Sequence, residues 1–224
     1  METITTIISL LSRYGMMFVK GTGVTLYMAF LTVLFGAILG SLICLARRVN
    51  FAPLRWVAAA YVEVIRGTPM LLQITLSYLT LPELLHMDIQ PLYCVILALI
   101  LNSAAYVSEI IRAGIQAVDV GQAEAARSLG LSQTQNLRYI IFPQALKNIL
   151  PAIANEFVVI IKESAITYTI GVQDIMSAVN AVKGATFIIV EPLLVATAIY
   201  FCLCFPTSKI IAYFERRMSR GDKR

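Results

Sequence analysis

Lys162 and Glu163 lie next to each other in a long apolar stretch, where a charged side chain is costly unless it faces a cavity or a partner. A lysine can bind the carboxylate of a zwitterion, and a glutamate can bind its ammonium group. Ser164 and Thr167 follow closely, and on an α-helix Thr167 shares a face with Glu163. We therefore expect these four residues to line a site for an amino-acid-like solute.

Two polar residues in neighbouring apolar stretches are expected at a similar depth and are second-rank members of this site. They are Arg66, about 16 Å along its helix at 1.5 Å per residue, and Asn102. A structural role remains open for the charged residues, because a carboxylate and an arginine three positions apart on one helix can neutralise each other. Glu63 has this spacing to Arg66, and Glu109 has it to Arg112.

The composition sets the class of protein that must position these groups. Apolar residues make up 58% of the 224-residue chain and charged residues 14%, which is too apolar for a soluble domain. Since a bilayer core needs roughly 20 apolar residues in a helix, the sequence predicts an all-α, polytopic membrane protein with five transmembrane helices in a single domain, 1–224. The expected spans are 21–46, 55–81, 91–115, 145–172 and 188–214, with an outer interfacial segment over 1–20 and a polar loop over 117–143.

The basic residues gather on one side of this five-span arrangement. The positive-inside rule then places the N-terminus outside the cell and the polar loop and the C-terminus in the cytoplasm. The net charge of +5 therefore reflects topology, and nucleic acid is not an expected partner.

The sequence contains no phosphate-binding G-x-x-x-x-G-K-[ST] loop and no Ser/His or Cys/His catalytic arrangement. Its four cysteines lack metal-ligand spacing, and its one histidine is expected in a loop. We therefore expect no catalytic residue, no metal and no ATP site in this chain.

The polar loop contains the segment GQAEAARSLGLSQTQNLRYIIFP, residues 121–143. Asp119 and Ser132 can each cap a short helix, with a glutamine three positions later reaching back. Gly130 suits the left-handed residue that ends the first helix, expected over 120–129. The second helix should weaken before Pro143, because the residue before a proline disfavours the helical region.

One surface of the first of these helices suits the approach of another protein. Ala125 and Ala126 are small enough to let a partner come close, while Glu124 and Arg127 can fix its register by polar contacts. The alternative is an ordinary amphipathic loop helix.

The spacing of Glu124-Ala125-Ala126, Gly130, Ile140 and Pro143 resembles the EAA signature of ABC-type importer permeases, with Phe142 where that family usually has leucine. Other segments are similar to the polar amino-acid permease subfamily, and the match extends over about 21–217. They are Arg66-Gly67-Thr68-Pro69 with Gln73, Ala104-Ala105-Tyr106 with Glu109, Arg112 and Gly114, Pro143-Gln144-Ala145, and Lys162-Glu163-Ser164 with Ile170-Gly171.

The resemblance implies the permease subunit of an ATP-driven importer for polar amino acids in the bacterial inner membrane, working by alternating access. It implies a second permease, identical or paralogous, a cytoplasmic ATPase subunit that binds ATP and Mg, and an extracytoplasmic solute-binding protein. It also implies a set of ATPase-coupling residues: Gly121, Glu124, Ala125, Ala126, Arg127, Gly130 and Pro143.

Two other functions remain open at this point. A secondary transporter would use the same polar groups but usually has paired repeats within the chain, and none is evident in the sequence. A non-transporting membrane scaffold would use the loop for docking alone. Acidic Glu156 and Glu163 favour a basic amino acid, while glutamine-like and cystine-like solutes stay open.

Overall fold

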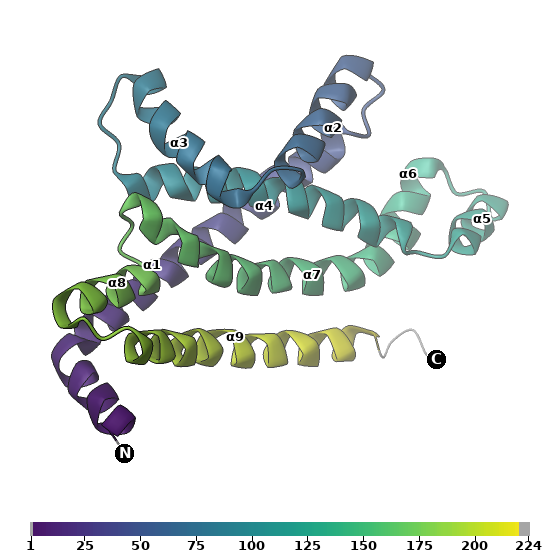
Figure 1. Ribbon diagram of the computed structural model, residues 1–224. Coiled ribbons are helices and arrows are strands. Elements are labelled where there is room, and N and C mark those ends of the chain that lie inside the picture. Colours follow the sequence, from purple (N-terminus) through teal and green to yellow (C-terminus); the bar gives the residue numbers. More distant parts are fainter. Residues whose placement is uncertain (1, 220–224) are drawn as a thin grey trace. The chain divides into compact units, whose positions relative to one another are not determined.

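The computed structural model describes residues 2–219, and the elements in this range are helical (Figure 1). In chain order they are α1 (Glu2–Ala46), α2 (Ala52–Arg66), α3 (Met70–Leu85), α4 (Pro91–Gln116), α5 (Val120–Ser128), α6 (Gln133–Asn136), the π-helical turn η1 (Leu137–Ile141), α7 (Phe142–Glu163), the 3₁₀ helix η2 (Ser164–Ile170), α8 (Ile175–Thr186) and α9 (Val190–Ser219). The all-α prediction is confirmed for this range. Three helices within it, α1, α4 and α9, are long and apolar enough to cross a bilayer, and α3 is a shorter apolar helix.

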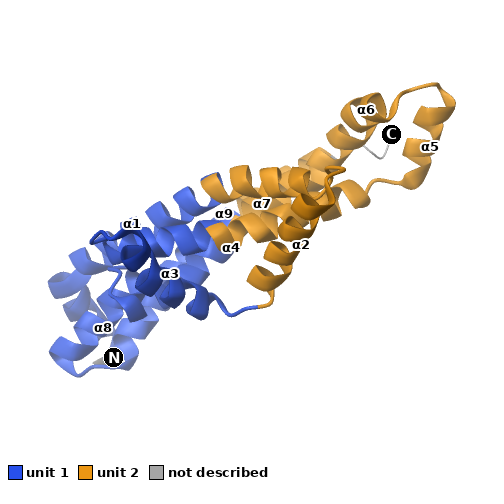
Figure 2. Cartoon of the chain, turned by 90° about the horizontal axis from the view of Figure 1, so that it is seen from above, with its two compact units in different colours: residues 1–34, 68–100, 157–207 blue, residues 35–67, 101–156, 208–224 orange. Residues whose placement is uncertain are grey.

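The chain divides into two compact units, coloured separately in Figure 2. Unit 1 comprises residues 1–34, 68–100 and 157–207, and unit 2 comprises residues 35–67, 101–156 and 208–224. The long helices α1, α4, α7 and α9 each contribute one part to either unit. The single domain expected from the sequence stays a prediction.

The N-terminal segment and the first expected span form one continuous helix. We expected an interfacial segment over 1–20 and a separate span over 21–46, but α1 runs without interruption for 45 residues. No proline occurs in this range to stop the helix. Leu10 and Phe18 are buried in a cluster with Val179 and Val195, so the first turns of α1 are part of the core of unit 1.

The second expected span, 55–81, is divided into α2 and α3. The helix α2 ends where the Gly67 N–H bonds to the Glu63 carbonyl, and Pro69 stands immediately before α3. Proline has no N–H to donate, and Pro69 itself is extended with a ψ of 139°, so the helical hydrogen bonding stops between α2 and α3. The Gln73 amide donates to the carbonyl and the hydroxyl of Thr68, at 3.1 and 2.9 Å, and so satisfies backbone at the start of α3.

Small residues allow close helix packing in unit 2. A Cβ on Gly36 would lie 2.7 Å from Ser103 Oγ, and one on Gly40 would lie 2.7 Å from the Ala104 carbonyl oxygen. Small residues of this kind let membrane helices approach each other closely. The C-terminal part of α1 is therefore held against α4 inside this unit.

Asp174 caps α8 from a buried position in unit 1. Its Oδ1 accepts a hydrogen bond from the Ser177 N–H at 2.8 Å, while its side chain is buried and its Oδ2 has no hydrogen-bond partner among residues 2–219. A Cβ on Gly21 would lie 2.6 Å from the Asp174 carbonyl oxygen, so α1 packs directly on this turn. Burial raises the pKa of the Asp174 carboxyl to about 6, against backbone N–H contacts that lower it.

This raised pKa predicts a pH dependence of stability. The folded chain holds the Asp174 proton more tightly than the unfolded chain does. The protonated carboxyl therefore makes its full contribution to the free energy of unfolding below about pH 4, and this contribution is lost as the pH rises through about 6. The resulting change in the free energy of unfolding is roughly 2–3 kcal/mol, since one pKa unit corresponds to about 1.36 kcal/mol. Asp174→Asn keeps an N-cap acceptor but cannot ionise. We expect thermal unfolding in detergent to be less pH-dependent for this variant than for the wild type over about pH 4–6.

Asp119 provides a matched control for this measurement. It caps α5 in the same way, through the Gly121 N–H, but its side chain is exposed. The Asp119→Asn curve shows what replacing an exposed capping carboxylate does by itself. An Asp174→Asn curve parallel to the wild-type curve would exclude the buried carboxyl as the source of the pH dependence.

Candidate functional site

The polar loop folds into two short helices, as its capping residues predict. The Asp119 carboxylate accepts a hydrogen bond from the Gly121 N–H at 2.7 Å and caps α5. Gly130 follows α5 with a φ of +81°, in the left-handed region. The Gln135 N–H donates to Ser132 Oγ at 3.3 Å, and the Ser132 N–H donates to Gln135 Oε1 at 2.9 Å. The Ser132–Gln135 capping box and the left-handed glycine are confirmed. The second box expected at Asp119 is not formed among the described residues, since Oε1 of Gln122 accepts from Gln144 Nε2 at 3.5 Å.

The two alanines of the loop have different environments. Ala125 is exposed together with Glu124 and Arg127, whereas Ala126 is buried with 4% of its surface accessible. Asn136 is also buried and donates through Nδ2 to the Ala123 carbonyl at 3.4 Å, which ties α6 to α5. Only Ala125 of the expected pair therefore lies on the outer surface of α5, and Ala126 packs inside the loop.

The helix before Pro143 is widened and not broken. The Phe142 N–H bonds to the Leu137 carbonyl, five residues back, which is a π-helical hydrogen bond. Pro143 has no N–H and cannot form the bond to Tyr139 that an α-helix requires at its position. The predicted weakening before Pro143 thus takes the form of the π-helical turn η1, which joins α6 to α7.

Sequence reasoning missed two exposed apolar residues on this loop. Leu129 is 81% exposed at the end of α5, and Val120 is 68% exposed at its start. Large apolar side chains that are this open, outside the apolar spans, suit contact with another protein. The sequence feature that could have revealed them is an apolar residue at each end of an otherwise polar helix.

Lys162 and Glu163 line one pocket of about 380 Å³ in unit 1, which we call the Lys162 pocket. Its other lining residues are Met70, Ala165, Ile166, Tyr168 and Thr169. The pocket combines a cation, a carboxylate and a threonine hydroxyl with apolar and aromatic surface. This set can bind both charges of a zwitterion and the aliphatic part of its side chain.

Ser164 and Thr167 do not line this pocket. Ser164 is fully buried and donates its hydroxyl to the Ile161 carbonyl at 2.8 Å. Thr167 is also fully buried, and its hydroxyl has no partner among residues 2–219. The α-helix ends at Glu163 and continues as the 3₁₀ helix η2, so the shared face expected for Glu163 and Thr167 is lost.

Arg66 and Asn102 belong to unit 2. Asn102 is 5% exposed. The guanidinium of Arg66 lies 5.6 Å from the centre of the Tyr106 ring, and its Nη1 lies 3.9 Å from Oε1 of Glu109. The spacing of Glu63 and Arg66, three positions apart on one helix, suggested that these two residues pair. Among the described residues, the carboxylate that lies next to Arg66 is instead that of Glu109.

Glu109 is the centre of a charge cluster in unit 2. Its Oε2 accepts from Arg47 Nη1 at 3.0 Å, and its Oε1 accepts from Arg112, as the i,i+3 spacing predicts. With Arg66, one carboxylate meets three guanidinium groups, which leaves the cluster with a net charge of +2. The Glu109 side chain is 19% exposed.

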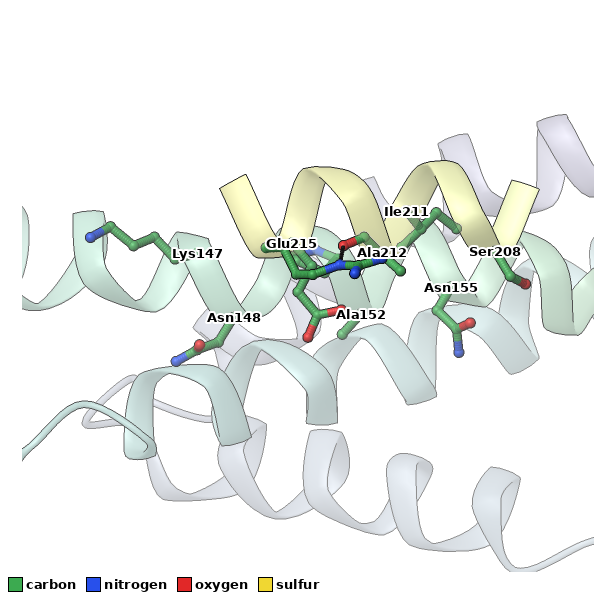
Figure 3. Close-up of a pocket in the computed structure, with 10 residues that line it drawn as sticks. Lys147, Asn148, Ala152, Asn155, Ser208, Ile211, Ala212 and Glu215 are labelled. Atoms are coloured by element: carbon green, nitrogen blue, oxygen red, sulfur yellow. Dashed lines mark hydrogen bonds between the residues drawn. The ribbon is translucent and has the colours of Figure 1, made fainter. Parts of the chain in front are cut away.

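A second polar cavity, of about 630 Å³, lies in unit 2 between α7 and the end of α9; we call it the Asn155 cavity. Figure 3 shows Asn148, Ala152 and Asn155 along α7, and Ser208, Ile211, Ala212 and Glu215 along α9. Lys147 and Arg216 also line it. Charges of both signs and two amides suit a polar solute, although sequence reasoning did not propose this site.

The described residues contain no group of three or more His, Cys, Asp or Glu side chains placed to hold a metal ion.

The chain matches known transport proteins over nearly its whole length. Residues 32–220 match the family described as "Binding-protein-dependent transport system inner membrane component". The arginine transport system permease protein ArtQ of Bacillus subtilis (strain 168) is 42% identical over 203 residues, covering 91% of this chain and 93% of that protein. The putative glutamine transport system permease protein GlnP of Rickettsia conorii is 39% identical, covering 89% and 92%.

Solved structures support the same assignment. The crystal structure of an amino acid ABC transporter with histidines contains a chain that is 44% identical and superposes with a TM-score of 0.90, covering 94% of this chain and 98% of that one. The inward-facing MetNI methionine ABC transporter shares the fold at a TM-score of 0.72 and 18% identity. The chain therefore belongs to the family of binding-protein-dependent transport system inner membrane components.

Proposed function

We propose that this chain is the permease subunit of an ATP-driven importer of polar amino acids in the bacterial inner membrane. The observation on which the proposal depends is the Lys162 pocket, in which a cation and a carboxylate from one helix end line a solute-sized cavity together with apolar residues. The names of the relatives, which refer to arginine and glutamine transport, support an amino acid as the solute.

The proposed topology has five spans, with the N-terminus outside and the C-terminus in the cytoplasm. Parts of α1, α4 and α9 meet the length and hydropathy that a span requires. The α2–α3 segment and α7 with η2 form the other two spans, and their polar residues face the solute path. The basic residues gather on the cytoplasmic side in this arrangement.

The loop formed by α5, α6 and η1 couples the permease to a separate ATPase. Its exposed face presents Glu124, Ala125 and Arg127 with the apolar Leu129, which suits a groove on a partner. Gly121, Ala126, Gly130 and Pro143 act by shaping this loop. The partner subunit supplies ATP and Mg, a second permease completes the pathway, and an external binding protein delivers the solute.

Transport proceeds by alternating access between an outward-open and an inward-open state. ATP can drive this change only if it binds the two states with different affinity. Lys162 binds the solute carboxylate and Glu163 its ammonium group or basic side chain, with Ser164 and Thr167 supporting the pocket wall. Arg66 and Asn102 contribute from unit 2 to the polarity of the path, and the Asn155 cavity serves release on the cytoplasmic side.

Reconstitution with the ATPase and the binding protein tests this function. We expect uptake of labelled arginine or glutamine into vesicles to require ATP and not an ion gradient. Lys162→Ala and Glu163→Gln should each reduce uptake at least tenfold, since a hydrogen bond to a charged group contributes about 1.5–3 kcal/mol. Assembly with the ATPase should be unchanged.

Lys183→Ala and Glu83→Gln are matched controls in the same unit, because neither residue lines the pocket. They should transport as the wild type does. Uptake that follows an ion gradient without ATP would identify a secondary transporter. ATPase activity that the solute never stimulates would indicate a scaffold.

A further inference from the structure

An apolar groove of about 400 Å³ lies in unit 2 and shares no lining residue with the Asn155 cavity; we call it the Arg48 groove. Its walls come from the end of α1, the end of α4 and the start of α7, represented by Leu45, Ile115 and Leu150, and Leu137 of η1 also lines it. Arg48, in the turn after α1, is its one charged lining residue. The groove therefore combines a long apolar wall with a single cation at its end.

The groove lies next to the positive charge cluster of Glu109. Arg47 precedes Arg48 in the chain, and Arg112 lies on α4 beside the groove-lining residue Ile111. Since one carboxylate balances only one of the three cluster guanidiniums, Arg48 adds its charge to an existing excess of +2. This end of the groove is thus electropositive and favours an anionic headgroup.

The surroundings of the groove limit what can fill it. The groove-lining part of α1 ends a stretch without charged residues, 21–46, which lies at hydrocarbon depth if the chain spans a membrane. A polar solute would find one charged partner and an apolar wall. A lipid supplies both an acyl chain for the wall and a phosphate for the arginine.

We propose that the Arg48 groove binds an anionic phospholipid, with one acyl chain along Leu45, Ile115 and Leu150 and the phosphate against Arg48. Basic pockets between membrane helices bind anionic headgroups by the same physics. The proposal needs the chain to lie in a membrane, but it does not depend on which solute is transported.

Native mass spectrometry of the assembled complex tests the headgroup contact. Complexes released from nanodiscs that contain phosphatidylglycerol should retain this lipid, and those from phosphatidylcholine nanodiscs should retain far less lipid. Arg48→Ala should weaken phosphatidylglycerol binding about fivefold, which corresponds to about 1 kcal/mol for one basic residue at the interface. Arg55→Ala is the control, because Arg55 is also exposed but does not line the groove.

A second pair of variants tests the apolar wall. Leu45 and Leu42 lie on the same helix with 62% and 56% of their surfaces exposed, and only Leu45 lines the groove. Leu45→Trp should obstruct the groove and reduce lipid retention, whereas Leu42→Trp should not. Because both residues are exposed, neither change should prevent folding.

Three results would overturn the proposal. The first is wild-type retention of phosphatidylglycerol by both Arg48→Ala and Leu45→Trp. The second is an equal loss in Arg48→Ala and Arg55→Ala, which would indicate general attraction of lipid to basic residues. The third is a crosslink from a photoreactive residue at position 45 to another protein chain, which would make the groove a protein interface. Unchanged solute transport in these variants would not contradict lipid binding in the groove.

Discussion

Glu109→Ala is expected to destabilise the permease by roughly 2–3 kcal/mol, because it leaves Arg47, Arg66 and Arg112 without the carboxylate that joins them. Breaking a fully buried ion pair costs about 3–5 kcal/mol. We expect a smaller destabilisation here because solvent screens the charges: Glu109 is 19% exposed, and Arg66 and Arg112 are each 39% exposed. The effect should appear as a lower unfolding temperature of the detergent-solubilised protein and a lower yield in membranes.

Glu63→Ala is the matched control for this prediction. Glu63 is an exposed glutamate in the same unit, and it is absent from the cluster. Its removal should change the unfolding temperature little. Glu109→Gln should give an intermediate result, because an amide oxygen still accepts hydrogen bonds but does not balance charge. A Glu109→Ala protein as stable as the Glu63→Ala protein would show that the cluster contributes no stability.

Local chemistry made much of the polar loop predictable from the sequence. A capping box involves residues three positions apart, and a left-handed glycine depends on its own φ, so Ser132, Gln135 and Gly130 could be interpreted without knowledge of the rest of the fold. The same holds for Glu109 and Arg112, whose contact follows from one helical turn. The all-α class was likewise predictable, because the apolar runs are long enough for spanning helices and lack the alternating pattern of barrel strands.

Contacts between distant segments could not be predicted in the same way. Arg47 and Glu109 are 62 residues apart, and nothing in their spacing indicates that they meet. Ala125 and Ala126 are the same residue type, and only the folded loop distinguishes the exposed residue from the buried one. The helix type after Glu163 was also not predictable from the sequence. The chain changes there from α to 3₁₀ geometry, and Thr167 does not line the pocket.

Gly130→Val is expected to abolish ATP-driven uptake while leaving the permease in the membrane. Gly130 has a φ of +81°, which a β-branched residue adopts only with strain. A cost of about 1–2 kcal/mol at this one residue is enough to move the end of α5. If the loop couples to an ATPase as proposed above, the exposed Glu124, Ala125 and Leu129 would then no longer fit that partner together. Uptake in vesicles should fall to the level measured without ATP, and the ATPase should co-purify in reduced amount.

Gly184→Val is the control that distinguishes the effect of the backbone conformation at Gly130 from the effect of replacing any glycine by valine. A Cβ on either Gly130 or Gly184 would meet no atom within 4 Å, so neither site is sterically closed, but only Gly130 has a positive φ. Gly184→Val should therefore retain uptake, with at most a small change in stability from helix propensity. Gly130→Asn should recover part of the activity, because asparagine adopts the left-handed region more readily than valine. Full uptake by Gly130→Val would mean that coupling does not depend on the geometry of this loop.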